Sequence, residues 1–166
     1  MLKPDFYFDS IFQIPYERLY DHGIKALIYD IDNTMAGYDE MRPPVKIITL
    51  VSNLKDIGFK VALLSNNNAK RVTSFNESMG LPMAHKANKP LTTSIKCLMG
   101  EMEVTKKETV IIGDQLFTDV WCGKNAGVTT ILVKPLTEKD VLSVKLKRGL
   151  ERQLLKHYLK GHTNPL

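Results

Sequence analysis

The chain has 166 residues, 43% of them apolar, so it can bury one compact core but is too short to indicate two domains. No apolar run is long enough to cross a bilayer, and the N-terminus MLKPDFYFDS lacks the apolar core of a secretory signal. We therefore expect a single domain over residues 1–166, cytoplasmic, with peripheral attachment to the inner face of the membrane left open. The net charge of +5 is concentrated at one end, because residues 134–160 hold eight basic and three acidic side chains.

The chain alternates between apolar runs and segments of helical spacing. Residues 1–22 show no clear period, and we expect them to form an irregular arm against the domain. Strands are predicted over residues 26–29, 61–64, 110–112 and 129–133, and helices over about 45–57, 69–79, from Pro90 onward and 117–126. Continuous apolar runs are typical of strands buried on both faces of a parallel sheet. The alternation predicts an α/β fold with an open, doubly wound, mainly parallel sheet.

Beyond the last strand, residues 137–160 form a basic segment with leucines at four-residue spacing, which predicts a helix. In the simplest interpretation, the leucines of this helix pack against the rest of the domain. Two others remain open: attraction to an anionic membrane, which we rank first, and contact with nucleic acid. The two cysteines, Cys97 and Cys122, lack metal-ligand spacing and are expected to be core thiols. The sequence predicts no oligomeric state.

Polar residues follow three of the predicted strands. They are Asp30, Asp32 and Thr34 after the first, Ser65 and Asn66 after the second, and Asp114 after the third. The carboxyl ends of parallel strands meet at one edge of a sheet, where ligands bind. Lys89 and Asp119 lie in the segments that continue from this edge, so we expect them to join the group. Asp30 and Asp32 are two residues apart in extended chain, so their carboxylates repel each other, which favours a bound cation or a shared proton.

This set of side chains suits one hard divalent cation and one phosphate. Mg²⁺ prefers oxygen ligands and commonly bridges carboxylates to substrate phosphate oxygens. Ser65 and the neighbouring amides can donate hydrogen bonds to an anion. Lys89 stands before the helix predicted from Pro90, where its charge would oppose the helix dipole by about 0.3–1 kcal/mol until a phosphate binds.

The order Asp30-Ile31-Asp32-Asn33-Thr34, Ser65-Asn66, Lys89-Pro90, and Gly113-Asp114 with Asp119 resembles the four motifs of the haloacid dehalogenase (HAD) superfamily of phosphohydrolases. Within it, "YDIDNT", "LLSNN" and "GDQLFTDV" most resemble the YqeG-type branch, which is related to phosphatidylglycerophosphate phosphatases. The similarity spans residues 25–133.

The resemblance implies a role for each matching residue. Asp30 attacks phosphorus and forms an aspartyl-phosphate, while Asp32 protonates the leaving oxygen and later deprotonates water. Mg²⁺ is held by Asp30, Asp114, the main-chain carbonyl of Asp32, and Asp119 as a ligand or anchor. Phosphate is bound by Ser65, Asn66, Lys89 and Thr34.

Spacing also bears on the substrate. Family members that enclose small metabolites carry a cap domain, but residues 34–65 and 66–89 each have room for little more than one helix, so no cap domain fits. We therefore predict a Mg²⁺-dependent phosphomonoesterase with phosphatidylglycerophosphate as its favoured substrate. The alternatives are a phosphatase for a soluble metabolite or a phosphorylated macromolecule, and a non-catalytic membrane- or RNA-binding module.

Overall fold

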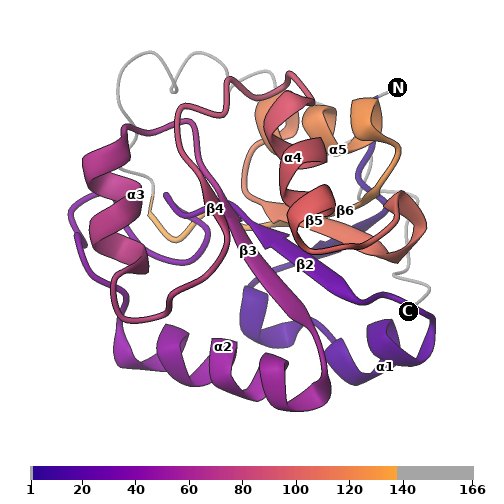
Figure 1. The fold of residues 1–166 in the computed structure, drawn as a ribbon, viewed down its shortest axis with the longest axis horizontal. Helices are drawn as coiled ribbons and strands as arrows, with labels where there is room; N and C mark the ends of the chain where they lie inside the picture. Colours follow the sequence, from indigo (N-terminus) through magenta and orange to yellow (C-terminus); the bar gives the residue numbers. More distant parts are fainter. Residues whose placement is uncertain (1, 138–166) are drawn as a thin grey trace.

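The computed structural model describes residues 2–137, so the predicted basic helix lies outside the described residues apart from its first position. Six strands form one sheet, and every neighbouring pair is parallel (Figure 1). Their order is β1-β6-β5-β2-β3-β4, with bounds Phe6–Phe8 (β1), Ala26–Tyr29 (β2), Lys60–Leu64 (β3), Met83–Ala84 (β4), Thr109–Gly113 (β5) and Thr129–Val133 (β6). The predicted α/β fold with an open parallel sheet is confirmed.

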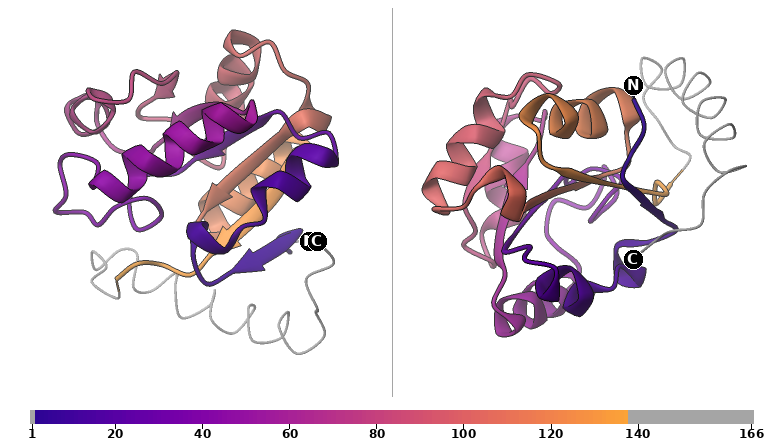
Figure 2. Two further views of the ribbon diagram at one scale, coloured as in Figure 1. Left: turned by 90° about the horizontal axis from the view of Figure 1, so that it is seen from below. Right: turned by 90° about the vertical axis from the view of Figure 1, so that its right-hand side faces the viewer.

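Helices cover both faces of this sheet (Figure 2). They are α1 (Tyr16–Asp21), α2 (Val45–Ile57) and α3 (Ala69–Asn76) on one face, and α4 (Thr93–Glu101) and α5 (Trp121–Ala126) on the other. Val51 of α2 and Phe75 of α3 pack in one half of the core, and Ile95 of α4 packs in the other. Strand β2 contributes Leu27 to the first half and Ile28 to the second, which is why its sequence is apolar throughout.

The third helix of the prediction, α4 in the structure, begins later than expected. It starts at Thr93 instead of Pro90, because the backbone N–H of Leu91 donates to the carbonyl of Asn88 at 2.9 Å in a turn that precedes the helix. Lys89 therefore does not stand at a helix N-terminus. The predicted opposition between the Lys89 charge and a helix dipole therefore does not arise. The Lys89 ammonium instead contacts Asp30, Asp119 and the carbonyl of Leu64.

Helix α3 ends at Asn76, three residues earlier than expected. The side-chain amide of Asn76 donates to the carbonyl of Leu81 at 2.7 Å and accepts from its N–H at 2.9 Å. These two hydrogen bonds turn the chain towards β4. By contrast, α2 has the predicted bounds and is followed by Gly58, whose φ of +113° lies in the left-handed region that glycine adopts without strain.

The N-terminal segment was expected to be irregular, and that expectation is wrong. It forms strand β1, a short 3₁₀ helix η1 (Ile11–Gln13) and helix α1. Strand β1 joins the sheet beside β6, with Phe6 opposite Ile131. Asp5 fixes this pairing, because its Oδ2 accepts hydrogen bonds from the N–H and hydroxyl of Thr130 at 2.8 and 2.9 Å.

The two cysteines differ in their surroundings. Cys122 is buried on α5, as expected, but Cys97 is exposed. On α4 the buried positions are Ile95 and Leu98, so Cys97 falls on the outward side of the helix. The expectation of two core thiols is therefore wrong for Cys97.

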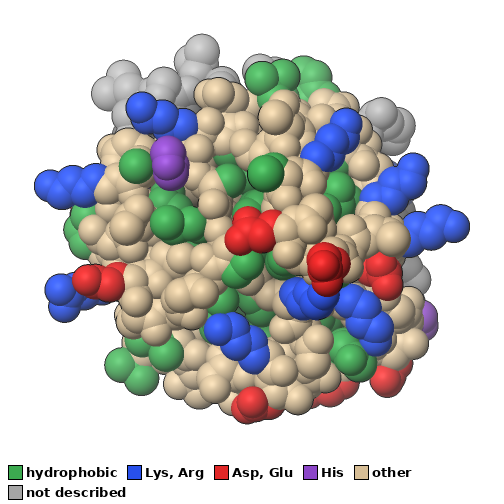
Figure 3. All heavy atoms as spheres, viewed as in Figure 1, with side chains coloured by type: hydrophobic (Ala, Val, Ile, Leu, Met, Phe, Trp, Pro, Cys, Tyr) green, Lys and Arg blue, Asp and Glu red, His purple; other side chains and the backbone are tan. Residues whose placement is uncertain are grey.

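The segments that follow β2 and β3 contain one helix each, α2 and α3. Residues 2–137 accordingly hold no inserted domain, as the spacing predicted. No helix in this range is long and apolar enough to cross a membrane. Basic and acidic side chains are interspersed over the face shown in Figure 3, with apolar side chains visible between them.

Candidate active site

The structure brings the polar residues at the strand ends together. Strands β5, β2 and β3 are neighbours, and Asp114, Asp30 and Ser65 follow them directly; all three side chains are buried. A pocket of about 350 Å³ opens at this edge and is lined by Asp30, Asp32, Tyr38, Ser65, Asn66, Asn67, Lys89, Gln115 and Thr118. Asn67 was expected here, as one of the amides beside Ser65, whereas the sequence did not point to Tyr38, Gln115 or Thr118.

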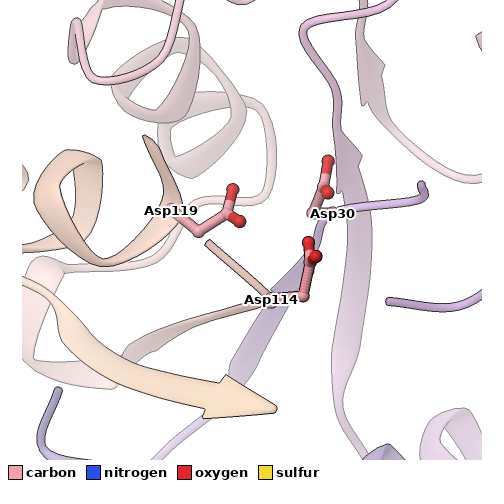
Figure 4. A group of neighbouring side chains, drawn as sticks. All are labelled: Asp30, Asp114 and Asp119. Carbon is pink, nitrogen blue, oxygen red and sulfur yellow. The ribbon is translucent and has the colours of Figure 1, made fainter. Parts of the chain in front are cut away.

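Three carboxylates converge beside the pocket (Figure 4). Asp30, Asp114 and Asp119 each offer an oxygen, and these oxygens lie within 4.8 Å of one another. Asp119 comes from a π-helix, η3 (Leu116–Val120), and the backbone N–H of Gln115 donates to its Oδ2 at 3.1 Å. Three buried carboxylates at this spacing form a donor set suited to a hard divalent cation.

Lys89 lies against the same carboxylates. Its Nζ donates to Asp30 Oδ1 at 2.7 Å, to Asp119 Oδ1 at 2.6 Å and to the carbonyl of Leu64 at 3.0 Å, which uses all three ammonium hydrogens. Asn66 holds the Lys89 backbone from both sides, accepting from its N–H at 2.7 Å and donating to its carbonyl at 3.3 Å. The side chain of Asn66, predicted to bind phosphate, is therefore engaged in placing Lys89.

The formal charges of the four side chains in this cluster, Asp30, Asp114, Asp119 and Lys89, do not cancel one another. Three carboxylates and one ammonium carry a formal excess of two negative charges. Burial raises the pKa of Asp30 well above its usual value, Lys89 opposes this shift, and Asp119 and Asp114 add to it. Burial acts to lower the pKa of Lys89, but the carboxylates of Asp119 and Asp30 outweigh it and raise that pKa. A divalent cation would supply the missing positive charge, so these residues fit a metal.

Asp32 has its own cationic partner, which the sequence analysis missed. Arg71 of α3 is 4% exposed, and its Nη2 lies 3.0 Å from Asp32 Oδ1. Asp30 is paired with Lys89 and Asp32 with Arg71. These two buried cations therefore reduce the repulsion between the aspartates, which a bound metal was expected to relieve. A signal was present in the sequence: Arg71 precedes the apolar Phe75 by four residues, so the two lie on the same, buried side of α3.

Two predicted phosphate ligands have further contacts. Ser65 lines the pocket, and its Oγ accepts a hydrogen bond from the N–H of Asn67 at 3.1 Å. The hydroxyl of Thr34 is turned to Asp114 Oδ1, to which it donates at 3.4 Å. The structure thus places Thr34 beside the candidate metal ligands.

Asn33, between the two motif residues Asp32 and Thr34, was also missed. Its φ of +62° is left-handed, a conformation that asparagine tolerates better than most residues. Its carbonyl accepts from the N–H of Leu136 at 3.0 Å, and its Oδ1 accepts from the hydroxyl of Thr137 at 2.9 Å. Hydrogen bonds therefore join the segment after β6 directly to the motif that contains Asp30 and Asp32.

Known proteins resemble this chain along most of its length. Residues 86–139 match the family model described as HAD-hydrolase-like. The protein named "Probable phosphatase YqeG" from Bacillus subtilis (strain 168) is 38% identical over 160 residues, which cover 96% of this chain and 93% of that protein. The chain therefore belongs to the HAD-like hydrolases, as its motifs predicted.

More distant relatives extend the comparison. Phosphatidylglycerophosphate phosphatase 1 of chloroplasts and mitochondria from Arabidopsis thaliana is 25% identical over 92% of this chain, which spans 47% of that protein. The cobalt-bound form of the deoxy-D-mannose-octulosonate 8-phosphate phosphatase YrbI from Haemophilus influenzae superposes with a TM-score of 0.55, at 20% identity over 84% of this chain and 88% of that one. This last likeness shows a shared fold.

Proposed function

We propose that this protein is a Mg²⁺-dependent phosphomonoesterase that acts through an aspartyl-phosphate formed on Asp30. The observation that carries the proposal is the buried cluster of Asp30, Asp114, Asp119 and Lys89 beside an open pocket, in a chain of a phosphatase family. Asp32, which also lines the pocket, supplies the second carboxyl that hydrolysis requires.

The reaction has two steps. An oxygen of Asp30 bonds to phosphorus as the bond from phosphorus to the leaving oxygen breaks, and the carboxyl of Asp32 gives its proton to that oxygen. Water then attacks phosphorus, Asp32 takes a proton from the water, and the bond from phosphorus to Asp30 breaks. Ser65 and Lys89 donate hydrogen bonds to the phosphoryl oxygens, for which Lys89 exchanges one of its present acceptors.

Mg²⁺ would be held by the side chains of Asp30, Asp114 and Asp119 and the main-chain carbonyl of Asp32, and when bound it supplies charge neutralisation to the phosphoryl group. The test is thermal unfolding with and without Mg²⁺. At about 100 times its dissociation constant, the ion should stabilise the protein by about 2.7 kcal/mol. Asp114→Asn should lose most of this gain, whereas the exposed Asp56→Asn should retain it. An equal gain in both variants would rule out this metal site.

Phosphatidylglycerophosphate is the substrate that we favour. Two distant relatives are named as phosphatases of this lipid, although the chain spans only 47% and 56% of their lengths. The absence of an inserted domain in residues 2–137 suits a substrate presented by a surface. Exposed apolar side chains add support, since the six large ones in the described range all follow the carboxyl end of a strand: Phe12, Met41, Val45, Leu91, Trp121 and Leu136.

A phosphate-release screen distinguishes the substrates. Vesicles containing phosphatidylglycerophosphate, sugar phosphates, nucleotides, a phosphopeptide and 4-nitrophenyl phosphate are compared with Mg²⁺ present. We expect the lipid to turn over fastest and Asp30→Asn to abolish all activity. Rapid hydrolysis of a soluble phosphate with the lipid untouched would favour the metabolite alternative. Activity that persists in Asp30→Asn would remove Asp30 as nucleophile, and no activity at all would favour a binding module.

We also propose that the protein attaches peripherally to the cytoplasmic face of an anionic membrane. The exposed apolar residues that follow the strands in the chain support this proposal. Sedimentation with phosphatidylglycerol vesicles should recover the protein with the pellet at low salt and less of it at high salt, because electrostatic attraction is screened. Met41→Ser combined with Leu91→Ser should reduce sedimentation and lipid turnover but leave hydrolysis of 4-nitrophenyl phosphate unchanged. Binding to RNA in place of vesicles would contradict the proposal.

A further inference from the structure

Arg71 joins two parts of the candidate site that are distant in sequence. Its Nε and Nη2 donate to Asp32 Oδ1 at 3.2 and 3.0 Å, across 39 residues of chain. The same guanidinium donates through Nη1 to the carbonyl of Glu40 at 2.6 Å and through Nη2 to the carbonyl of Gly37 at 3.2 Å. One buried side chain therefore holds both a catalytic carboxyl and the segment that carries Tyr38 into the pocket wall.

We propose that Arg71 is a positioning residue, which fixes Asp32 against the leaving group of the substrate and holds residues 37–40 at the rim of the pocket. The inference rests on the proposed function, because it takes Asp32 to be the group that protonates the leaving oxygen. It adds a residue outside the four motifs and assigns it to the leaving-group side of the reaction.

The hydrogen bonds on Asp32 show how this positioning works. Two donors from Arg71 fix Oδ1, while Oδ2 accepts a hydrogen bond at 3.1 Å from Nδ2 of Asn67, which lines the pocket. Oδ2 is therefore the oxygen on the substrate side. A planar guanidinium with a fork of donors can hold one carboxylate oxygen and two carbonyls at once, which a lysine ammonium on a flexible stem does poorly.

A purely structural role for Arg71 makes a different prediction. Its guanidinium carbon lies 5.1 Å from the centre of the Phe75 ring, and its contacts to Gly37 and Glu40 anchor a loop, so its loss could simply reduce the fraction of folded enzyme. That effect would lower kcat/KM for every substrate by the same factor. Misplacement of Asp32 would instead lower kcat/KM more for substrates whose leaving oxygen must be protonated than for substrates whose leaving group departs as an anion.

The test compares kcat/KM for glycerol 3-phosphate, whose alkoxide leaves poorly, with that for 4-nitrophenyl phosphate, whose phenolate leaves without help. In Arg71→Gln we expect a loss of about 10²-fold for the alkyl phosphate and less than about 10-fold for the aryl phosphate. Arg71→Lys should lie between Arg71→Gln and the wild type in this ratio. Because the ratio cancels the concentration of active enzyme, Arg71→Lys decides the question even where Arg71→Gln folds poorly.

Two further variants make the outcome unambiguous. Lys70→Ala removes the exposed cation next to Arg71 on the same helix and should leave both rates unchanged. Asp32→Asn should shift the ratio at least as much as Arg71→Gln. If Asp32→Asn shifts the ratio and neither Arg71 variant does, Arg71 is not a positioning residue and the proposed function stands. If Asp32→Asn leaves the ratio unchanged, the role of Asp32 fails, and the inference about Arg71 fails with it.

Discussion

The ammonium nitrogen of Lys89 lies 2.7 Å from a carboxylate oxygen of Asp30, although 59 residues separate them in the chain. Asn66 makes this possible, because it binds the Lys89 backbone on both sides of the residue. Asp30 follows β2, Asn66 follows β3 and Lys89 follows β4. Asn66 places Lys89, and Lys89 in turn holds Asp30, the candidate nucleophile.

Replacement of Lys89 should damage both stability and turnover. In Lys89→Met, the buried carboxylates of Asp30 and Asp119 lose their cation, a change that costs about 3–5 kcal/mol in comparable buried pairs. Activity should fall by about 10²–10³-fold, as for loss of a donor that stabilises developing charge. Urea unfolding and phosphate release measure the two effects. Lys96→Met, at an exposed position of α4, should change neither, and wild-type stability in Lys89→Met would contradict the assigned contacts.

Gly113 should not tolerate a methyl group. A Cβ at this position would stand inside contact distance of the Cβ, Cγ and Oδ2 atoms of Asp119, so Asp119 would be pushed from its place. Gly113→Ala should cost about 1–3 kcal/mol and reduce the stabilisation by Mg²⁺. Gly100→Ala is the matched control, since its Cβ would meet nothing within 4 Å and alanine favours a helix. Thermal unfolding of both variants with and without Mg²⁺ tests this, and equal melting temperatures would refute it.

The contact between Asp5 and β6 predicts a pH-dependent stability. Burial acts to raise the pKa of Asp5, but hydrogen bonds from Lys124 and Thr130 outweigh it, so the pKa is lowered from its usual 3.8. The stabilisation is therefore complete above the unfolded-state value and is lost as the pH falls through the lower folded-state value. Asp5→Asn should cost about 1 kcal/mol at pH 7.

Urea unfolding at several pH values checks this prediction. The difference between wild type and Asp5→Asn should shrink as the pH is lowered below about 4, where the carboxylate becomes protonated. Asp56→Asn, at an exposed position on α2, should show a small difference. A difference for Asp5→Asn that is the same at every pH would mean that charge on Asp5 does not contribute.

The two thiols should react at very different rates. Cys97 is exposed, whereas Cys122 is buried, donates to the carbonyl of Leu91 at 3.3 Å, and has a pKa that burial raises to about 11. An aromatic disulfide reagent should modify one thiol quickly in the native protein and the second only after denaturant is added. Native Cys97→Ser should show no fast phase, and a fast phase in that variant would mean that Cys122 is accessible.

The sequence predicted those parts of the site that lie next to strands. The ends of β2, β3 and β5 are marked by a change from apolar to polar residues, so Asp30, Ser65 and Asp114 could be placed together before any contact was known. Arg71 could not be placed in this way. Its neighbour Lys70 is exposed and equally basic, so the one local sign that Arg71 turns inward is its spacing of four residues from Phe75 on α3.

Other features depended on single tertiary contacts. The start of α4 follows from a turn at Asn88, where a rule about proline at the first helical position misled the prediction. Strand β1 has three partly buried aromatic residues and no alternating pattern, and it is a strand because Asp5 fastens it to Thr130. Such contacts leave no local periodicity for a sequence to reveal.

The two outermost strands of the sheet are also its shortest, since β1 has three residues and β4 has two, whereas β3, β5 and β6 have five each. A short edge offers few unpaired backbone groups to a strand from another molecule. Growth of this sheet into fibrils or strand-swapped assemblies is therefore disfavoured. If copies of the chain associate through residues 2–137, we expect the interface to consist of side-chain contacts and not of backbone hydrogen bonds between edge strands.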